Sequence, residues 1–163
     1  MYREKEYLIE RLKEAGFNAR IHESMKSLKS SGEIRTGAVI RYDDVLTRSG
    51  SKKTYRDQEG AQHKRVKIWD RDTKLKVVIG EATEEQCEKL FTAFLEKLER
   101  GIWIDENWVG IEVEDIEWVD GADSILKSRL AVEIIVSFKG GIYRENGYAA
   151  VEQVRIDAEK GAG

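Results

Sequence analysis

Two stretches of the chain carry the apolar spacing of amphipathic helices, and the first is residues 2–15. Its apolar stripe consists of Leu8, Ile9, Leu12 and Ala15. Residues three and four positions apart lie on one face of a helix, so this spacing predicts a helix that buries one side. Gly16 stands where a residue of left-handed conformation commonly ends a helix.

The second helical pattern is the most regular in the chain. Thr83 is placed to cap a helix, and Gln86 follows at the spacing of a capping box. Glu84 and Glu85 favour the positive end of the helix dipole, and Gly101 is predicted to end the helix. The apolar face consists of Cys87, Leu90, Phe91, Phe94, Leu95 and Leu98. A stripe this regular predicts packing against a sheet.

Alternation of apolar and polar residues predicts strands in five places. These are residues 17–21, 38–46, 66–82, 108–119 and 130–138. Strands expose alternate side chains to opposite faces, so alternation indicates strands with one buried face. In the third stretch, the polar residues Asp70, Arg71, Asp72 and Thr73 predict a turn, which makes that stretch a hairpin.

The last two of these stretches are predicted to pair. In the fourth, apolar residues move from odd to even positions, which predicts a β-bulge near Asp115. The fifth alternates without fault and is predicted to end at Gly140 and Gly141. The connection between them, 120–128, is short enough for antiparallel neighbours.

The predicted elements are separated by segments in which apolar residues do not recur at helix or strand spacing. Residues 25–36 are predicted as a loop, and residues 47–64 as a long basic loop that is mobile in the isolated subunit. The only apolar anchor in the long loop is Tyr55, and ordering a backbone without anchors is costly. Residues 1–145 are predicted as one α+β domain, an antiparallel or mixed sheet packed by two amphipathic helices. Residues 146–163 are predicted as a partly disordered tail.

Composition excludes several classes of protein. The 163 residues are 36% charged with a net charge of −3, which argues against a protein that coats nucleic acid generally. Two His and one Cys are too few for a zinc site of about four nitrogen and sulfur ligands. No apolar run reaches the roughly 18–20 residues of a membrane helix, and the charged N-terminus is unlike a signal peptide. We therefore expect no metal, cofactor or membrane partner.

Charge is segregated along the chain. Residues 47–67 contain seven basic and two acidic side chains, a net +5, whereas residues 105–120 contain seven acidic side chains and no basic one. Like charges crowded on one strand destabilise it unless a cation lies opposite. We therefore predict that the two segments meet, within the chain or between copies. The candidate interface residues are Arg48, Lys52, Lys53, Arg56, Glu112, Glu114 and Glu117.

Carboxylates are the main candidates for catalysis. Asp43 and Asp44 follow one another in a predicted strand, and with Glu133 they are the ligands that a divalent-metal nuclease would use. Adjacent residues of a strand point to opposite faces, however, so these two aspartates do not readily share one metal. Neither histidine has a Ser or Cys nucleophile in a strained turn nearby. We predict that the protein is not an enzyme.

The run VEIIVSFKGGIYR, residues 132–144, closes the chain after a helix, a long loop, a hairpin, a second amphipathic helix and a strand pair. This run and this order of elements resemble the tail terminator (tail completion) proteins of long-tailed bacteriophages and prophage tail-like elements. The resemblance implies a non-enzymatic ring, typically of six copies, that caps the tail tube and meets the head–tail connector. It implies no catalytic residues and no cofactor, and a location in the host bacterial cytoplasm and then in the virion tail.

A nucleic-acid-binding module is the alternative interpretation. The basic residues of 47–67 would contact phosphates, and Tyr55 would stack on a base. The acidic overall charge and the lack of further aromatic residues among the basic ones count against it. The two interpretations share one feature, since DNA that passes through a ring would meet positive charge on its inner wall.

Overall fold

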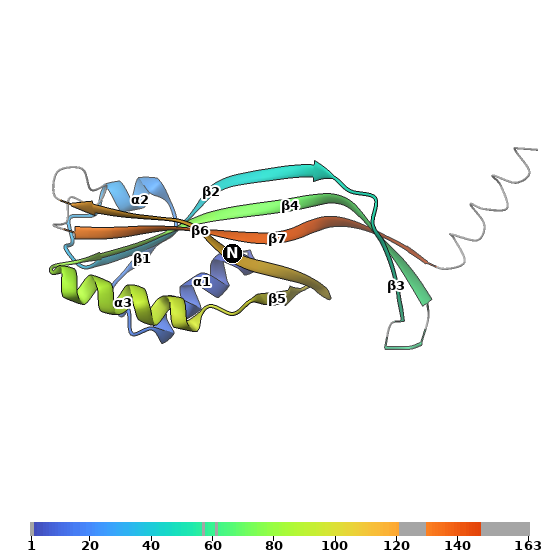
Figure 1. Ribbon diagram of the computed structural model, residues 1–163, viewed down its shortest axis with the longest axis horizontal. Helices are drawn as coiled ribbons and strands as arrows, with labels where there is room; N and C mark the ends of the chain where they lie inside the picture. Colours follow the sequence, from blue (N-terminus) through green and yellow to red (C-terminus); the bar gives the residue numbers. More distant parts are fainter. Residues whose placement is uncertain (1, 57, 61, 121–129, 148–163) are drawn as a thin grey trace, which may run out of the picture. The chain divides into compact units, whose positions relative to one another are not determined.

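The computed structural model describes residues 2–56, 58–60, 62–120 and 130–147. Within these ranges the helices and strands are α1 (Arg3–Glu14), β1 (Ile21–His22), α2 (Met25–Lys29), β2 (Thr36–Arg48), β3 (Lys52–Arg56), β4 (Gln62–Glu81), α3 (Glu84–Lys97), β5 (Gly101–Ile104), β6 (Asn107–Asp120) and β7 (Leu130–Gly147). The strands form one sheet in the order β1-β2-β4-β7-β6-β5, and β3 pairs with β4 outside that path (Figure 1).

The fold is β-rich, which corrects the α+β prediction. Strands make up 54% of the structure and helices 24%. The sheet is mixed, because β1 and β2 are parallel whereas β3–β4, β5–β6 and β6–β7 are antiparallel. The two expected amphipathic helices are present as α1 and α3. The class prediction was wrong because segments interpreted as a turn and as loops are strand.

The predicted hairpin over 66–82 is one of these errors. β4 runs without a break from Gln62 to Glu81 and passes straight through the expected turn. The polar residues there find partners in the extended conformation: Lys67 Nζ lies 2.7 Å from Asp70 Oδ1, and Lys139 Nζ lies 2.5 Å from Asp72 Oδ2. Paired in this way, residues that commonly form turns are stable inside a strand.

The predicted mobile loop over 47–64 is the second error. β3 pairs with β4 in antiparallel register, from Lys52 opposite Val66 to Arg56 opposite Gln62. Such a ladder satisfies the backbone groups that a free loop would leave to water, and each bond contributes about 0.5–1.5 kcal/mol. The segment is therefore a hairpin arm rather than a tether.

Smaller differences concern other segments expected to be irregular or to end early. The expected loop over 25–36 contains α2, whose first turn is capped by the Ser24 hydroxyl accepting from the Ser27 amide at 3.1 Å. β7 does not stop at the two glycines but continues to Gly147. From residue 148 onward, the predicted tail lies outside the described residues, as does most of the connection expected over 120–128.

The chain divides into two compact units. Unit 1 comprises Met1–Asp44 and Asp72–Gly140, and unit 2 comprises Val45–Arg71 and Gly141–Gly163. β2, β4 and β7 each contribute residues to both units. Each unit is therefore described by its own contacts.

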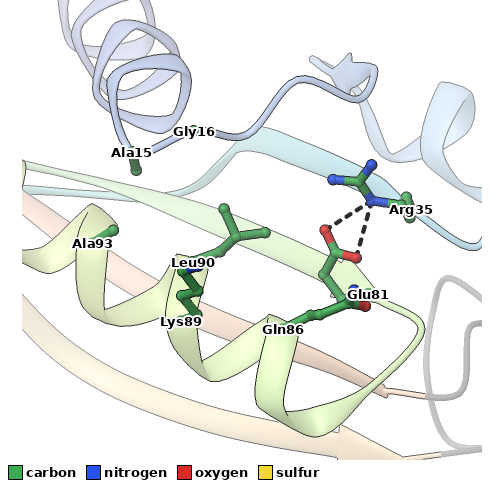
Figure 2. Close-up of a pocket in the computed structure, with 8 residues that line it drawn as sticks. All are labelled: Ala15, Gly16, Arg35, Glu81, Gln86, Lys89, Leu90 and Ala93. Atoms are coloured by element: carbon green, nitrogen blue, oxygen red, sulfur yellow. Dashed lines mark hydrogen bonds and ion pairs between the residues drawn. The ribbon is translucent and has the colours of Figure 1, made fainter.

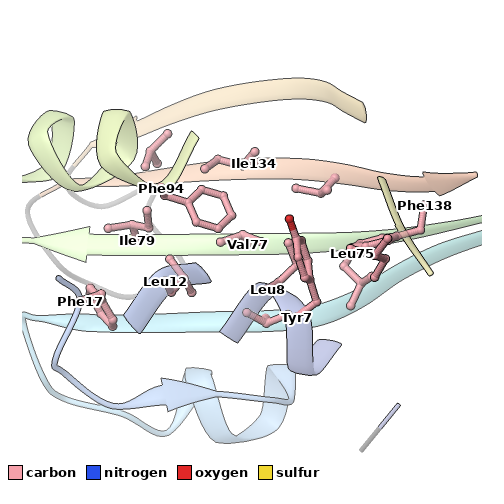
Figure 3. Packing of buried hydrophobic residues seen from close by; sticks show 14 of the residues in the cluster. Tyr7, Leu8, Leu12, Phe17, Leu75, Val77, Ile79, Phe94, Ile134 and Phe138 are labelled. Atoms are coloured by element: carbon pink, nitrogen blue, oxygen red, sulfur yellow. The ribbon is translucent and has the colours of Figure 1, made fainter. Parts of the chain in front are cut away.

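Unit 1 has an apolar core on each face of its sheet. α1 and α3 lie on one face and α2 on the other (Figure 1). The larger core, between the sheet and α1 and α3, contains Tyr7, Leu8, Leu12, Phe17, Leu75, Val77, Ile79, Phe94, Ile134 and Phe138 (Figure 3). The smaller core, beside α2, contains Leu28, Ala38, Ile40, Val78 and Ala131. The packing predicted for the apolar stripes of both helices is confirmed for their central residues.

The predicted cap of α3 by Thr83 is confirmed, but the predicted end of the helix is not. Thr83 Oγ1 accepts from the Gln86 amide at 3.3 Å, and the helix ends at Lys97. Gly101 begins β5 instead. A Cβ at Gly101 would lie 2.4 Å from Trp108 Cζ2, so this glycine lets the indole pack directly on the backbone.

The predicted β-bulge is confirmed. The register between β6 and β7 shifts between Val113 and Asp115. Val113 lies opposite Val136 before the shift, and Ile116 lies opposite Ile134 after it. The extra residue therefore keeps the apolar side chains of β6 on the face that α1 and α3 cover.

Phe94→Ala tests the larger core. Phe94 is fully buried, and we expect its truncation to lower the free energy of unfolding by about 3–5 kcal/mol through lost transfer energy and a residual cavity. Urea denaturation of both proteins measures this loss. Thr92→Ala, an exposed position on the same helix, is the matched control and should change little. Equal stability of Phe94→Ala and wild type would contradict the packing described above.

Candidate functional site

The hairpin of β3 and β4 in unit 2 places three cations on one face. In the antiparallel register, Thr54 lies opposite Lys64, between the positions of Lys52 and Arg56. Directly opposite residues share a face, as do residues two apart, so these three basic side chains lie together. None of them has an ion pair with a described residue. We call Lys52, Arg56 and Lys64 the cation row.

Two basic side chains of the opposite face, Arg65 and Lys67, are engaged within unit 2. Arg65 is buried, pairs with Glu145 and lies over the Tyr143 ring. Lys67 pairs with Asp70. The Arg65 contacts join β4 to β7, and both cations are thereby removed from the set available to a partner.

The four basic residues predicted for the interface therefore differ in their surroundings. Lys52 and Arg56 belong to the cation row, whereas the Arg48 guanidinium stacks 4.9 Å from the centre of the Trp69 ring. The backbone of Lys53 lies opposite Arg65. Sequence reasoning missed Lys64 as a member of the row, because only the register of the hairpin shows which basic residues share a face.

The predicted acidic partner Glu114 is already neutralised inside unit 1. Its carboxylate lies 2.9 Å from Lys74 Nζ and 3.3 Å from Lys139 Nζ. The hydrogen bond from Lys74 is the main cause that lowers the pKa of Glu114, and it likewise raises the pKa of Lys74. Lys139 has a raised pKa chiefly through its hydrogen bond to Asp72. Glu114 thus belongs to a network of ion pairs that joins β4, β7 and β6.

The other acidic residues of β6 have no such partners. Glu112, Asp115 and Glu117 are exposed, and none forms an ion pair with a described residue. Their register partners on β7, residues 137, 135 and 133, alternate along that strand, so all three carboxylates lie on one face. We call Glu112, Asp115 and Glu117 the acidic edge.

The acidic edge contains an unfavourable pairing. Glu117 lies directly opposite Glu133, and like charges in that position destabilise a sheet. Glu133 is buried, and its Oε1 lies 3.4 Å from Lys76 Nζ without a hydrogen bond of good geometry. Lys76 therefore offsets the charge of Glu133 but not that of its neighbour.

Along the same residues, the edge of β6 that faces away from β7 has no partner strand in the described chain. β5 pairs only with Asn107–Gly110, and the Ile111 amide donates to the Arg100 carbonyl at 2.8 Å. Beyond this point, no strand in the described chain pairs with that side of β6. The side chains of Ile116 and Trp118, on the face of α1 and α3, are about 40% exposed there.

An aromatic pair marks the start of this edge. Trp103 and Trp108 lie opposite each other on β5 and β6, with ring centres 5.3 Å apart. They are 63% and 50% exposed. The turn between them contains Asp105 and Glu106, both at positive φ, as in the tightest hairpin turns. The open edge of β6 therefore begins next to a tight hairpin turn.

Unit 1 also contains a pocket of about 300 Å³ between α3 and the segments around the end of α1, the start of β2 and the end of β4. Figure 2 shows its lining: Ala15, Gly16, Arg35, Glu81, Gln86, Lys89, Leu90 and Ala93. Glu81 is only 1% exposed and accepts from Arg35 Nε at 3.1 and 3.0 Å through its two oxygens. The lining contains no His, Cys or Ser, so it offers no nucleophile paired with a base.

The groups considered for catalysis are dispersed. The structure shows no group of three or more His, Cys, Asp or Glu in its described part that is placed to hold a metal ion. Asp44 accepts from Thr73 and pairs with Arg41, and Glu133 is beside Lys76. Burial raises the pKa of the Cys87 thiol to about 11, which keeps it protonated. The nuclease interpretation therefore lacks its proposed centre.

Comparison of the chain with models of known protein families finds no match, and comparison with curated proteins finds no significant match. In the described part of the chain, no helix is long and apolar enough to cross a membrane.

Arg35→Met tests the pair in the pocket. It leaves the buried carboxylate of Glu81 without its cation, and we expect a loss of about 1–3 kcal/mol in the free energy of unfolding. Arg20→Met, at another exposed arginine, is the control. Changing both partners, Arg35→Met with Glu81→Leu, should recover most of the loss because no unpaired buried charge remains. Equal stability of Arg35→Met and wild type would contradict this role.

Glu114→Gln tests the charge network through pH. Because the pKa of Glu114 is lowered in the folded state, its ionised carboxylate stabilises the fold at pH values above its ordinary pKa of about 4.3. This stabilisation is lost as the pH falls below that value. The raised pKa values of Lys74 and Lys139 set the alkaline end of the pH range in which the network stabilises the fold. That stabilisation is lost when the two lysines deprotonate at strongly alkaline pH. The variant should be less stable than wild type at pH 7, and the difference should shrink below about pH 4.

The control for this experiment is Glu112→Gln, two residues away on the same strand and without an ion pair among the described residues. It should show little loss at pH 7. Thermal unfolding across the pH range measures both variants. A loss at pH 7 that is the same for Glu112→Gln and Glu114→Gln would argue against the network.

Proposed function

We propose that the protein is a non-enzymatic assembly protein whose copies join into a ring through oppositely charged surfaces. The observation that carries this proposal is the contrast between paired and unpaired charges. Charged side chains such as Lys74, Lys76 and Lys139 find counter-ions within unit 1, whereas the cation row and the acidic edge find none among the described residues. Two unpaired surfaces of opposite sign are suited to meet between copies.

The two surfaces are different, which determines the kind of assembly. When one surface of a subunit binds another surface of its neighbour, the contact repeats head to tail and either closes into a ring or extends as a filament. Closure depends on the rotation between neighbours. A ring is the outcome that fits the resemblance noted for residues 132–144.

By that resemblance, the ring terminates the tail tube of a phage or prophage tail-like element and joins it to the head–tail connector. Its partners are then other copies of the chain, typically six in all, the tail tube protein and the connector, with transient contact to DNA that passes through. The place of action is the host bacterial cytoplasm during assembly and then the virion tail. The exposed pair Trp103–Trp108 supports a role in contacts between proteins, since aromatic residues are enriched at such interfaces.

Nucleic-acid binding through the arm is the second candidate. The specific observation in its favour is that Lys52, Arg56 and Lys64 share a face and lack partners in the described chain. Three cations in a row also suit consecutive phosphates, and such binding would weaken steeply with salt.

Charge exchange separates the two candidates. The variant Lys52→Glu with Lys64→Glu should weaken self-assembly by at least about tenfold, because bringing like charges together costs several kcal/mol. Glu112→Lys with Glu117→Lys should do the same. A mixture of the two variants should assemble again, since each acidic arm then meets a basic edge. Sedimentation and light scattering over a range of concentration and salt measure these equilibria.

Lys26→Glu, at an exposed position on α2, is the control and should assemble like wild type. A protein that stays monomeric at all concentrations would contradict the ring. If that monomer also binds duplex DNA tightly, and loses the binding with salt and with Lys52→Glu, the nucleic-acid module is the better description.

A further inference from the structure

We propose that β3 of one copy adds as an extra strand to the open edge of β6 in a neighbouring copy. This inference rests on the proposed function and specifies its interface. The arm would join the neighbouring sheet by main-chain hydrogen bonds, with the charged side chains selecting the partner, as in other cases of strand addition.

Both strands have an unpaired edge of matching length. β3 has five residues, Lys52–Arg56, and among the described strands it pairs only with β4, on one of its sides. The regular part of β6 beyond its bulge is Asp115–Asp120. Unpaired N–H and C=O groups along two such edges form a template for pairing with another chain.

Charge selects the face on which the side chains meet. In β6 beyond the bulge, Asp115 and Glu117 lie on one face and Ile116 and Trp118 on the other. In β3, residues 52, 54 and 56 share a face. In an antiparallel register with Thr54 opposite Glu117, Arg56 would lie opposite Asp115 and Lys52 would lie diagonally from Glu117. Opposite charges in cross-strand positions stabilise a sheet. This pairing would also supply the cation that Glu117, opposite Glu133, lacks.

The same charges disfavour the competing pairings. Two β6 edges from different copies would bring Glu117 near its own counterpart, and two β3 edges would bring cations together. Like charges at these positions repel, so each edge is protected against its own copy. The pairing that remains is the one between different edges.

The open edge of β2 is a weaker partner for β6. Beyond Ala38, β2 has no strand on its outer side in the described chain. Its charged residues there already neutralise one another in part, since Arg41 Nη1 lies 3.3 Å from Asp44 Oδ2. β2 therefore presents no row of one sign to match the acidic edge.

Cross-linking with single cysteines tests which strands meet. Thr54→Cys and Glu117→Cys place thiols at the middle of each segment, and cross-strand neighbours in a sheet lie within reach of a bis-maleimide spanning about 8 Å. The native Cys87 is fully buried, so the introduced thiols react first. A mixture of the two variants should give covalent dimers, and each variant alone should give none.

Thr92→Cys, exposed on α3, replaces Glu117→Cys as the control and should give no product with Thr54→Cys. Cross-linking of Glu117→Cys with itself would overturn the proposal, because it would show like edges pairing. Assembly seen by light scattering without the Thr54–Glu117 product would also overturn it, while leaving the proposed ring intact. Failure to assemble at any concentration would overturn both.

Amide hydrogen exchange tests whether the contact is made by the backbone. If β3 adds to β6, amides within 52–56 and 115–120 should exchange at least tenfold more slowly in the assembled protein than in the dilute subunit. Amides of α3 serve as the internal reference and should change little. Assembly that leaves both strands at their monomer rates would mean docking by side chains alone, which contradicts strand addition.

Discussion

The structure of unit 1 depends on one constraint, the burial of β7 on both of its faces. Every residue from Ala131 to Phe138 is buried, so the strand must be central in the sheet and covered on each side. On one face, α1 and α3 supply apolar side chains. On the other, α2 covers only part of the strand, and the polar residues Glu133 and Ser137 lie within the buried run. Those two residues need polar partners, which the neighbouring strands provide.

The requirement for polar partners explains the charge network. Ser137 donates to Asp72, Lys139 bonds the other oxygen of that carboxylate, and Lys139 also reaches Glu114 on β6. The chain of contacts crosses three strands, so it fixes the order of neighbours as well as the local charge. Long lysine stems also cover apolar surface while their ammonium groups remain near solvent. Carboxylates within reach of these lysines are neutralised, and those beyond their reach form the acidic edge.

Local patterns predicted local structure well. The capping pair of Thr83 and Gln86 marks the start of α3, and the change of parity near Asp115 marks a bulge, because both signals act over a few residues. The turn prediction at Asp70 and Asp72 was misleading. The partners of Asp72, Ser137 and Lys139, are distant in the sequence, so no local pattern reveals them. The predicted fold class was wrong for the same reason. An uninterrupted β4 places more residues in strands than the predicted hairpin and loops would.

Only part of the candidate site could be predicted, because strand register also depends on interactions beyond the local sequence. Counting charges along the chain finds the basic and acidic segments, but only strand register sorts them into faces. Register places Lys64 between Lys52 and Arg56, and it places Glu114 at the bulge, where lysines from two other strands reach it. A count alone treats Glu114 and Glu117 as equivalent, whereas one is neutralised and the other stands opposite Glu133.

The bulge in β6 bears both on folding and on the assembly that we propose. Without it, Ile116 and Trp118 would turn away from the apolar core, because a shift of one residue exchanges the two faces of a strand. With it, the carboxylates of Asp115 and Glu117 are gathered on the other face, at an open edge. The bulge that keeps apolar side chains in the core therefore also gathers carboxylates of like charge on the other face. Like charges on one strand face destabilise the sheet. In the assembly that we propose, a cationic strand from a neighbour would relieve this repulsion, so the bulge would favour a partner of opposite charge over a like edge.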